Sequence, residues 1–216
     1  MTMRKHRWHA AAVTALLLTG CGGPESDATT GEATPLTKDQ VGRALPDGEA
    51  MTGWEQSFES TAIEMNELYR SQACPIKGNA GCGGARFFGA STFKRGEPFA
   101  SLTFQIVAYD SEQAAQDAYR VLWDGYYGTR AGQKAEPLDL GPIGDERDAR
   151  LGTSGIDGEP GAVTQMRVGT TLLWTMEAAT RKGDIDADSV QDLATMLAQR
   201  SQQAQNSDEP SATLND

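Results

Sequence analysis

Residues 99–109 place the strongest constraint on the fold, because apolar and polar side chains alternate along them with the two-residue period of a β-strand. The apolar positions are Ala100, Leu102, Phe104, Ile106 and Ala108. The preceding segment 84–94 is also rich in Phe and Thr, and the Arg95-Gly-Glu-Pro98 stretch between the two segments is typical of a turn. We therefore predict two antiparallel strands with one apolar face against a core.

Two longer helices are expected beside this sheet. Ser111 is a suitable N-cap for a helix that ends near Tyr126, and a helix from Ala187 to about Gln203 would carry an apolar stripe. Smaller elements are expected as helices over 37–45 and 61–69, short strands near 136–140 and 147–151, and a hairpin over 162–177. Paired strands followed by separate helices predict an α+β fold, with an antiparallel β-sheet and two main α-helices packed on one face.

The first 21 residues have the order of a bacterial export signal. Residues 1–9 are basic, and the apolar stretch 10–19 is too short to span a bilayer of about 30 Å. Leu18-Thr-Gly-Cys21 resembles the lipobox, which implies cleavage before Cys21 and a diacylglycerol thioether on its sulfur. An ordinary secreted protein is the alternative. The sequence thus predicts a protein that is lipid-anchored to the extracellular face of the cell membrane.

Four regions follow from composition. Residues 1–20 are the expected lipoprotein signal peptide, and residues 21–35 are small, polar and without apolar periodicity, which is typical of a flexible tether. Residues 36–203 are expected to form one sensor-like α+β domain, and the polar residues 204–216 a disordered tail.

Charge and histidine content exclude several functions. Without the leader the chain keeps 16 basic and 30 acidic residues, a net charge of −14, so we expect no binding to nucleic acid. The only histidines, His6 and His9, lie in the leader. A mature chain without imidazole cannot use Ser-His-Asp or Cys-His nucleophile activation, and it cannot supply a histidine ligand to a metal.

The remaining cysteines, Cys74 and Cys82, flank a segment with Pro75 and two glycines, which favours a tight turn. In an oxidising compartment we expect them to form a disulfide. A metal site is the less favoured alternative, because two further ligands are missing.

Five residues are candidates for binding a ligand. Trp123, Tyr126 and Tyr127 gather aromatic faces at the end of the predicted helix, where they could bind a flat ligand or simply belong to the core. Arg147 and Arg150 could bind an anion, or they could pair with the acids beside them.

Two motif matches fail in their context. Ser91-Thr-Phe-Lys94 matches the S-x-x-K motif of penicillin-binding proteins, but it lies in a predicted strand and its companion motifs are missing. Asp184, Asp186 and Asp188 alternate as in a calcium loop, but the required Gly and Glu are absent. We expect these acids to cap the last helix, and we predict no metal site.

Several segments together resemble the sensor-type lipoproteins of actinobacteria, which are related to the extracellular sensor domain of the mycobacterial serine/threonine kinase PknH. The similar segments are the cysteine pair and residues 45–54, 104–115, 140–145, 167–170 and 193–200. The resemblance implies an antiparallel sheet with helices on one side and a groove suited to a ligand. It carries over no residue of established function.

Taken together, these features predict a membrane-anchored extracytoplasmic lipoprotein with a non-catalytic, ligand-binding or sensor-like domain and no cofactor. The expected partners are the membrane, through the N-terminal lipid, and an unknown small molecule or envelope protein. Two alternatives stay open. A carboxylate-dependent cell-envelope hydrolase needs two acids across a cleft, and a scaffold or inhibitor lipoprotein needs an exposed apolar patch.

Overall fold

The computed structural model describes residues 33–96, 99–153, 158–180 and 185–214. The predicted signal peptide, Cys21 and most of the tether lie outside them.

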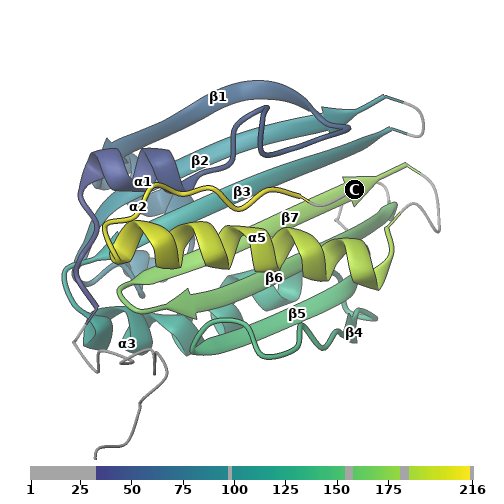
Figure 1. Cartoon of the computed structure of the whole chain (residues 1–216). Helices are drawn as coiled ribbons and strands as arrows, with labels where there is room; N and C mark the ends of the chain where they lie inside the picture. The colour runs from purple at the N-terminus through teal and green to yellow at the C-terminus, as the bar shows by residue number, and fades with distance from the viewer. Residues whose placement is uncertain (1–32, 97–98, 154–157, 181–184, 215–216) are drawn as a thin grey trace, which may run out of the picture. The chain divides into compact units, whose positions relative to one another are not determined.

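Within the described residues, seven strands form one antiparallel sheet in the order β1-β2-β3-β7-β6-β5-β4 (Figure 1). The strands are β1 (Glu55–Glu64), β2 (Ala85–Arg95), β3 (Ala100–Tyr109), β4 (Glu136–Pro137), β5 (Glu146–Thr153), β6 (Pro160–Val168) and β7 (Thr171–Ala179). The helices are α1 (Lys38–Ala44), α2 (Glu67–Ala73), α3 (Glu112–Leu122), α4 (Gly128–Arg130) and α5 (Ala187–Gln205), with a 3-10 turn η1 (Lys77–Asn79) and a π-helical turn η2 (Trp123–Tyr127).

The predicted central hairpin is confirmed. Strands β2 and β3 pair from Ala85 with Tyr109 to Arg95 with Ala100. The hairpin of β6 and β7 is also confirmed, and β7 pairs with β3, so the two hairpins lie side by side in the sheet. The α+β class and the antiparallel sheet are therefore as expected.

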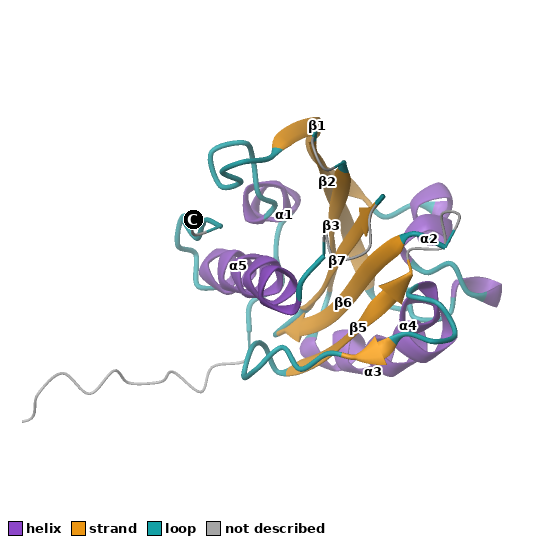
Figure 2. Cartoon of the chain, turned by 90° about the vertical axis from the view of Figure 1, so that its right-hand side faces the viewer, coloured by secondary structure: helices purple, strands orange, loops and turns teal. Residues whose placement is uncertain are grey.

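The helices cover both faces of this sheet, which differs from the expected arrangement on one face (Figure 2). Helices α1 and α5 pack on the face that carries Leu102, Phe104 and Ile106. Helices α2 and α3 pack on the other face, which carries Val107 and Tyr109. Since neighbouring residues of a strand point to opposite faces, each hairpin contributes to two cores. The sequence signal for helices on both faces was the run Ile106-Val-Ala-Tyr109, because four consecutive apolar residues put apolar side chains on both sides of a strand. All four residues are buried.

The helix starts follow local capping chemistry. Thr37 and Gln40 form a capping box at α1, the Ser111 side chain accepts from the backbone N–H of Ala114, and the Asp186 side chain accepts from that of Ser189. These bonds satisfy amides that have no partner inside the helix. The predicted starts of α1, α3 and α5 are confirmed.

The predicted helix over residues 61–69 is wrong. Strand β1 continues to Glu64, where Thr61 pairs with Ala90 and Ile63 pairs with Phe88, and α2 begins only after its N-cap, Asn66. Two β-branched residues within three positions favour an extended backbone, and pairing with β2 buries the Ile63 side chain in part, whereas Thr61 stays exposed.

The predicted disordered tail from residue 204 is also wrong for the residues described. Helix α5 continues to Gln205, and the segment that follows returns along the domain, where the backbone N–H of Leu214 donates to Ala50 at 2.8 Å. Arg200, only 6% exposed, holds this segment, since its guanidinium donates to the carbonyls of Ala212, Ala44, Arg43 and Leu45 at 2.9–3.2 Å. These contacts could not be predicted from the polar composition of the tail, because they are made by its backbone.

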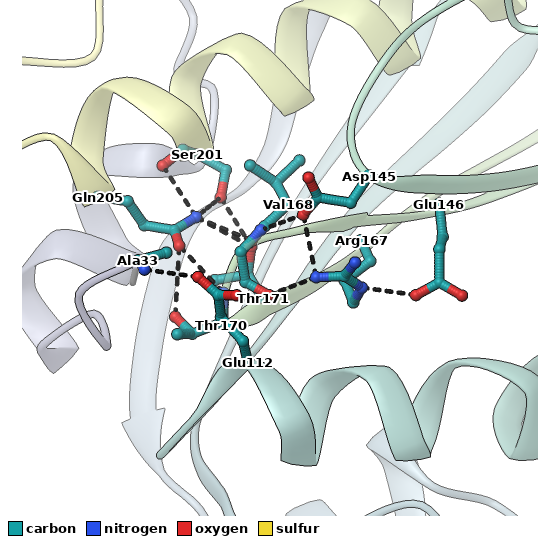
Figure 3. Close-up of polar contacts among 11 residues, drawn as sticks. Ala33, Glu112, Asp145, Glu146, Arg167, Val168, Thr170, Thr171, Ser201 and Gln205 are labelled. Carbon is teal, nitrogen blue, oxygen red and sulfur yellow. Dashed lines mark hydrogen bonds and ion pairs between the residues drawn. The ribbon is translucent and has the colours of Figure 1, made fainter. Parts of the chain in front are cut away.

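The chain enters the domain beside the β6–β7 turn (Figure 3). The backbone N–H of Ala33 donates to the Glu112 carboxylate at the start of α3. On the other side of the turn, the Gln205 amide accepts from the Thr170 N–H and donates to the Val168 carbonyl. A β-carbon on Gly169, whose φ is +50°, would overlap both Gln205 and Ala33. The polar groups here bind one another, which indicates a structural junction.

Candidate functional site

The aromatic candidates lie on the π-helical turn η2, which continues α3. Trp123 and Tyr127 are buried, at 4% and 1% exposure, whereas Tyr126 is partly exposed. The Tyr127 ring stacks on Trp174 with 4.6 Å between centroids, and its hydroxyl donates to the Ala73 carbonyl. Trp123 and Tyr127 therefore belong to the core, and only Tyr126 has a surface that a ligand could reach.

The turn depends on glycine. A β-carbon on Gly128 would lie 2.8 Å from the Trp123 ring, and one on Gly125 would lie 2.6 Å from Ile76. Both distances are too short, so the two glycines let the chain pass closely over its neighbours. The turn thereby sets the position of α4 and of its last residue, Arg130. π-Helical turns of this kind are frequent at functional sites.

The two arginine candidates do not come together. Arg147 pairs with Met166 and Arg150 pairs with Val163 in the β5–β6 register, and positions three apart on a strand face opposite sides of the sheet. Arg147 is exposed, while the Arg150 guanidinium donates to the Gly128 carbonyl at 2.8 Å and lies over the Trp123 ring. Arg150 thus stabilises the π-helical turn through its contacts with Gly128 and Trp123.

The acids near these arginines have other partners. Asp145 and Glu146 pair with Arg167, and Asp148 pairs with Arg120 at 3.0 Å. The alternative that Arg147 and Arg150 pair with these acids is therefore wrong among the described residues, because the acids pair with Arg120 and Arg167 instead.

A cleft of about 310 Å³ lies on the sheet face shared with α3 and α4. Alternate residues of β3 form its floor, and they are Ser101, Thr103 and Gln105. Val163, Met176 and Ala178 from the neighbouring strands add an apolar part, and Arg130, Ala131 and Thr153 line one wall. The cleft occupies the half of the sheet remote from the β6–β7 turn, because Ser101 pairs with Ala178 near the far ends of their strands.

Tyr126 and Tyr127 lie next to this cleft but do not line it, whereas Arg147 lines a separate hollow beside Arg120. The Tyr127 hydroxyl lies 3.4 Å from Oε1 of Gln105, and the Tyr126 hydroxyl accepts from Arg130 at 2.7 Å. Sequence reasoning missed the floor, because Ser101, Thr103 and Gln105 read as the solvent face of an amphipathic strand. Their uncharged side chains on a strand within the sheet were the available signal, since exposed faces are commonly charged.

Glu177 is the only acidic residue among those that line the cleft within the described chain, and its carboxylate lies on the other face of the sheet. There it shares the face of its register partner Leu102, is 4% exposed, and leaves Oε2 without a hydrogen bond among the described residues. Burial raises the pKa of this carboxyl to about 7, the positive charge of Arg95 opposes that rise, and Asp186 adds to it. Arg95 itself lies over the Trp54 ring at 4.9 Å.

The buried tyrosines act as hydrogen-bond donors. Burial raises the pKa of Tyr109, Tyr119 and Tyr127 well above the ordinary value, and the neighbouring Asp148 raises that of Tyr119 further. All three stay protonated at neutral pH, so they cannot act as bases there.

Of the rejected motifs, Ser91-Thr-Phe-Lys94 lies in a strand, as the sequence predicts. Ser91 and Lys94 are on β2, where Ser91 is buried and Lys94 is exposed and pairs with Glu55 at 3.0 Å. Positions three apart face opposite sides of the sheet, so they cannot form a nucleophile and its base. Asp186 is the N-cap of α5, and Asp184 lies outside the described residues. Within those residues no group of acids or cysteines has a metal-binding arrangement.

The disulfide between Cys74 and Cys82 is confirmed. Both cysteines are at most 1% exposed, and they join the end of α2 to the loop before β2. In the part of the chain that the structure describes, no helix has the length and apolar character needed to cross a membrane.

Comparison with known proteins gives a likeness of fold. No family model matches the sequence, and no curated protein matches it significantly. A similar solved structure is the extracellular domain of PknH from Mycobacterium tuberculosis, with a TM-score of 0.52 and 8% sequence identity. The alignment covers 82% of this chain and 100% of that domain. The likeness expected from the sequence therefore holds for the fold.

Proposed function

We propose that this chain is a lipid-anchored protein of the extracellular face of the cell membrane, whose domain binds a small molecule without transforming it. The observation that carries the proposal is the cleft over β3 and β7, with three polar side chains on its floor and an arginine in its wall. Pockets of a few hundred Å³ that combine apolar surface with a few placed polar groups are typical of ligand sites.

Binding without catalysis is favoured by the chemistry of the cleft. The hydrolase alternative needs a pair of acids about 5–9 Å apart across the substrate. Glu177 contributes to the cleft, but its carboxylate is on the opposite face, so the described lining supplies no such pair.

Features of the sequence and of the fold both support a location outside the cytoplasm. The Leu18-Thr-Gly-Cys21 pattern predicts lipidation, and the buried disulfide fits an oxidising compartment. The fold is also that of a domain described as extracellular in PknH.

The scaffold alternative has less support. The large apolar side chains most exposed among the described residues are Phe58, at 72%, and Leu68, at 61%. They lie on the separate elements β1 and α2, and isolated apolar side chains are normal on protein surfaces.

The anchor is tested by mass spectrometry of the membrane fraction. Wild-type protein should begin at an acylated Cys21, and the Cys21→Ala variant should keep its leader and carry no acyl mass. An unmodified wild-type N-terminus would contradict the anchor.

Binding is tested by native mass spectrometry of the full-length protein recovered from its own membrane. The wild type should retain a non-covalent small molecule. Ala178→Trp, which fills the cleft, should lose it, whereas Val121→Trp on the exposed side of α3 should not. Retention by all three proteins would show that the cleft is not the site.

A further inference from the structure

We propose that the cleft takes a small anion that carries hydroxyl groups, the chemistry of a sugar acid, and that Arg130 binds its acidic group. The inference rests on the proposed function and goes beyond it by naming the ligand class. It follows from which hydrogen-bonding groups line the cleft and which are missing.

The polar lining consists of donors that can also accept, together with one cation. Ser101 and Thr103 present hydroxyls, and Gln105 presents an amide. The Gln105 carbonyl oxygen lies 3.4 Å from the Tyr127 hydroxyl, whose one proton is donated to the Ala73 carbonyl, so the Gln105 amide keeps both its NH₂ and its carbonyl oxygen for a ligand. Hydroxyls and amides that both donate and accept match the hydroxyls of a ligand.

Arg130 is held in place without being neutralised. One of its terminal nitrogens donates to the Tyr126 hydroxyl at 2.7 Å, and its guanidinium carbon lies 5.5 Å from the centre of the Tyr126 ring. Within the described residues it makes no ion pair, in contrast to Arg120 and Arg167. Its other N–H groups therefore remain for an acceptor, and a guanidinium fork suits a carboxylate.

The local charge is the reverse of the charge of the whole chain. The mature protein carries a net charge of −14, yet the cleft presents an arginine and no carboxylate among its described side chains. An isolated positive group in an acidic protein selects for an anion at that point. The negative charge of the rest of the protein repels larger polyanions such as nucleic acids.

The apolar part of the floor suits a ring. Val163, Met176 and Ala178 present methyl and thioether groups beside the hydroxyls of β3. A pyranose has C–H groups on its faces and hydroxyls around its edge, and the cleft volume is at the small end of ligand pockets, which fits a single sugar unit.

The test is isothermal titration calorimetry of the full-length protein in detergent with three probes: D-glucuronate, D-glucose and inorganic phosphate. Glucuronate should bind at least tenfold more tightly than either of the others, because glucose lacks the carboxylate and phosphate lacks the ring. A methyl glycoside of glucuronate, substituted as in a polysaccharide, separates a glycan-borne sugar acid from a free one.

Variants locate the binding. Arg130→Gln should weaken glucuronate binding by about tenfold or more, the usual loss for a charge-assisted hydrogen bond, and remove the preference over glucose. Arg86→Gln, at the opposite end of β2 from the cleft, changes the net charge equally and should have no effect. Thr103→Val keeps the shape, removes a hydroxyl and should weaken both sugars.

Three outcomes would overturn the inference. Equal affinity for glucose and glucuronate, or glucuronate binding insensitive to Arg130→Gln, would exclude the anionic class. Absence of binding by all three probes would exclude the sugar-acid class. A co-purifying molecule that Ala178→Trp displaces would still support the proposed function in each case, so the two failures are distinguishable.

Discussion

Replacing Glu177 with Gln should change how the stability of this domain depends on pH. Glu177 is 4% exposed, its Oε2 has no hydrogen bond among the described residues, and burial raises its pKa from 4.5 to about 7. Gln has the same shape and no charge, so the substitution removes the titration and little else.

The sign follows from proton binding. The folded state binds the proton more tightly than the unfolded state, so wild-type stability is highest, relative to the variant, below pH 4.5. It then falls as the pH rises towards 7 and the buried carboxyl ionises. A rise in pKa from 4.5 to about 7 corresponds to about 3 kcal/mol at 1.36 kcal/mol per tenfold change in proton affinity. The Gln variant should therefore gain about 3 kcal/mol on the wild type between pH 4 and pH 8.

The assay is urea unfolding of both proteins at several pH values from 4 to 8, followed by near-ultraviolet circular dichroism. Urea is preferred because guanidinium chloride would screen the Arg95 charge that faces Glu177. The informative quantity is the difference in unfolding free energy, because the other carboxyls titrate in both proteins.

Glu59→Gln is the matched control. Glu59 is exposed on β1, so this variant changes the net charge equally and should keep a constant offset from the wild type. If the curves for Glu177→Gln and wild type run parallel within about 0.5 kcal/mol, burial does not disfavour the ionised carboxyl, and the reasoning fails.

Two further predictions concern parts that hold the fold together. Removing the disulfide by Cys74→Ser with Cys82→Ser should lower the unfolding free energy by about 2.5 kcal/mol, the chain-entropy value for a sequence separation of 8, and unchanged denaturant midpoints would contradict this. Arg200→Met should cost about 3 kcal/mol, because four backbone carbonyls lose their donor, and should expose the C-terminal segment to limited proteolysis. Arg43→Met, at an exposed and weakly paired position, should cost under about 1 kcal/mol, and equal losses would show that the buried contacts of Arg200 do not matter.

The sequence was sufficient where one local pattern determined one structure. The alternation over residues 99–109 gave β3, and the N-caps Ser111 and Asp186 located the starts of α3 and α5. Each of these signals depends on a period or on a hydrogen bond that spans three residues. The disulfide was predictable for the same reason, because its two ends are close in sequence.

Features that depend on tertiary contacts were not predictable. Arg200 holds a polar segment through backbone carbonyls, which no residue type encodes. The cleft combines alternate residues of β3 with Arg130, and the π-helical turn that places α4 depends on the approach of Gly128 to Trp123. Hydrophobic periodicity detects none of these relationships.

The contacts of Ala33 with Glu112 and with the Gly169 turn place the N-terminal end of the described domain at the β6–β7 turn. Ser101 lies seven residues along β3 from Ala108, the register partner of Thr171, so the cleft opens about 23 Å farther along the strands. A ligand would therefore reach the cleft at the end of the domain opposite to the point where the chain enters it.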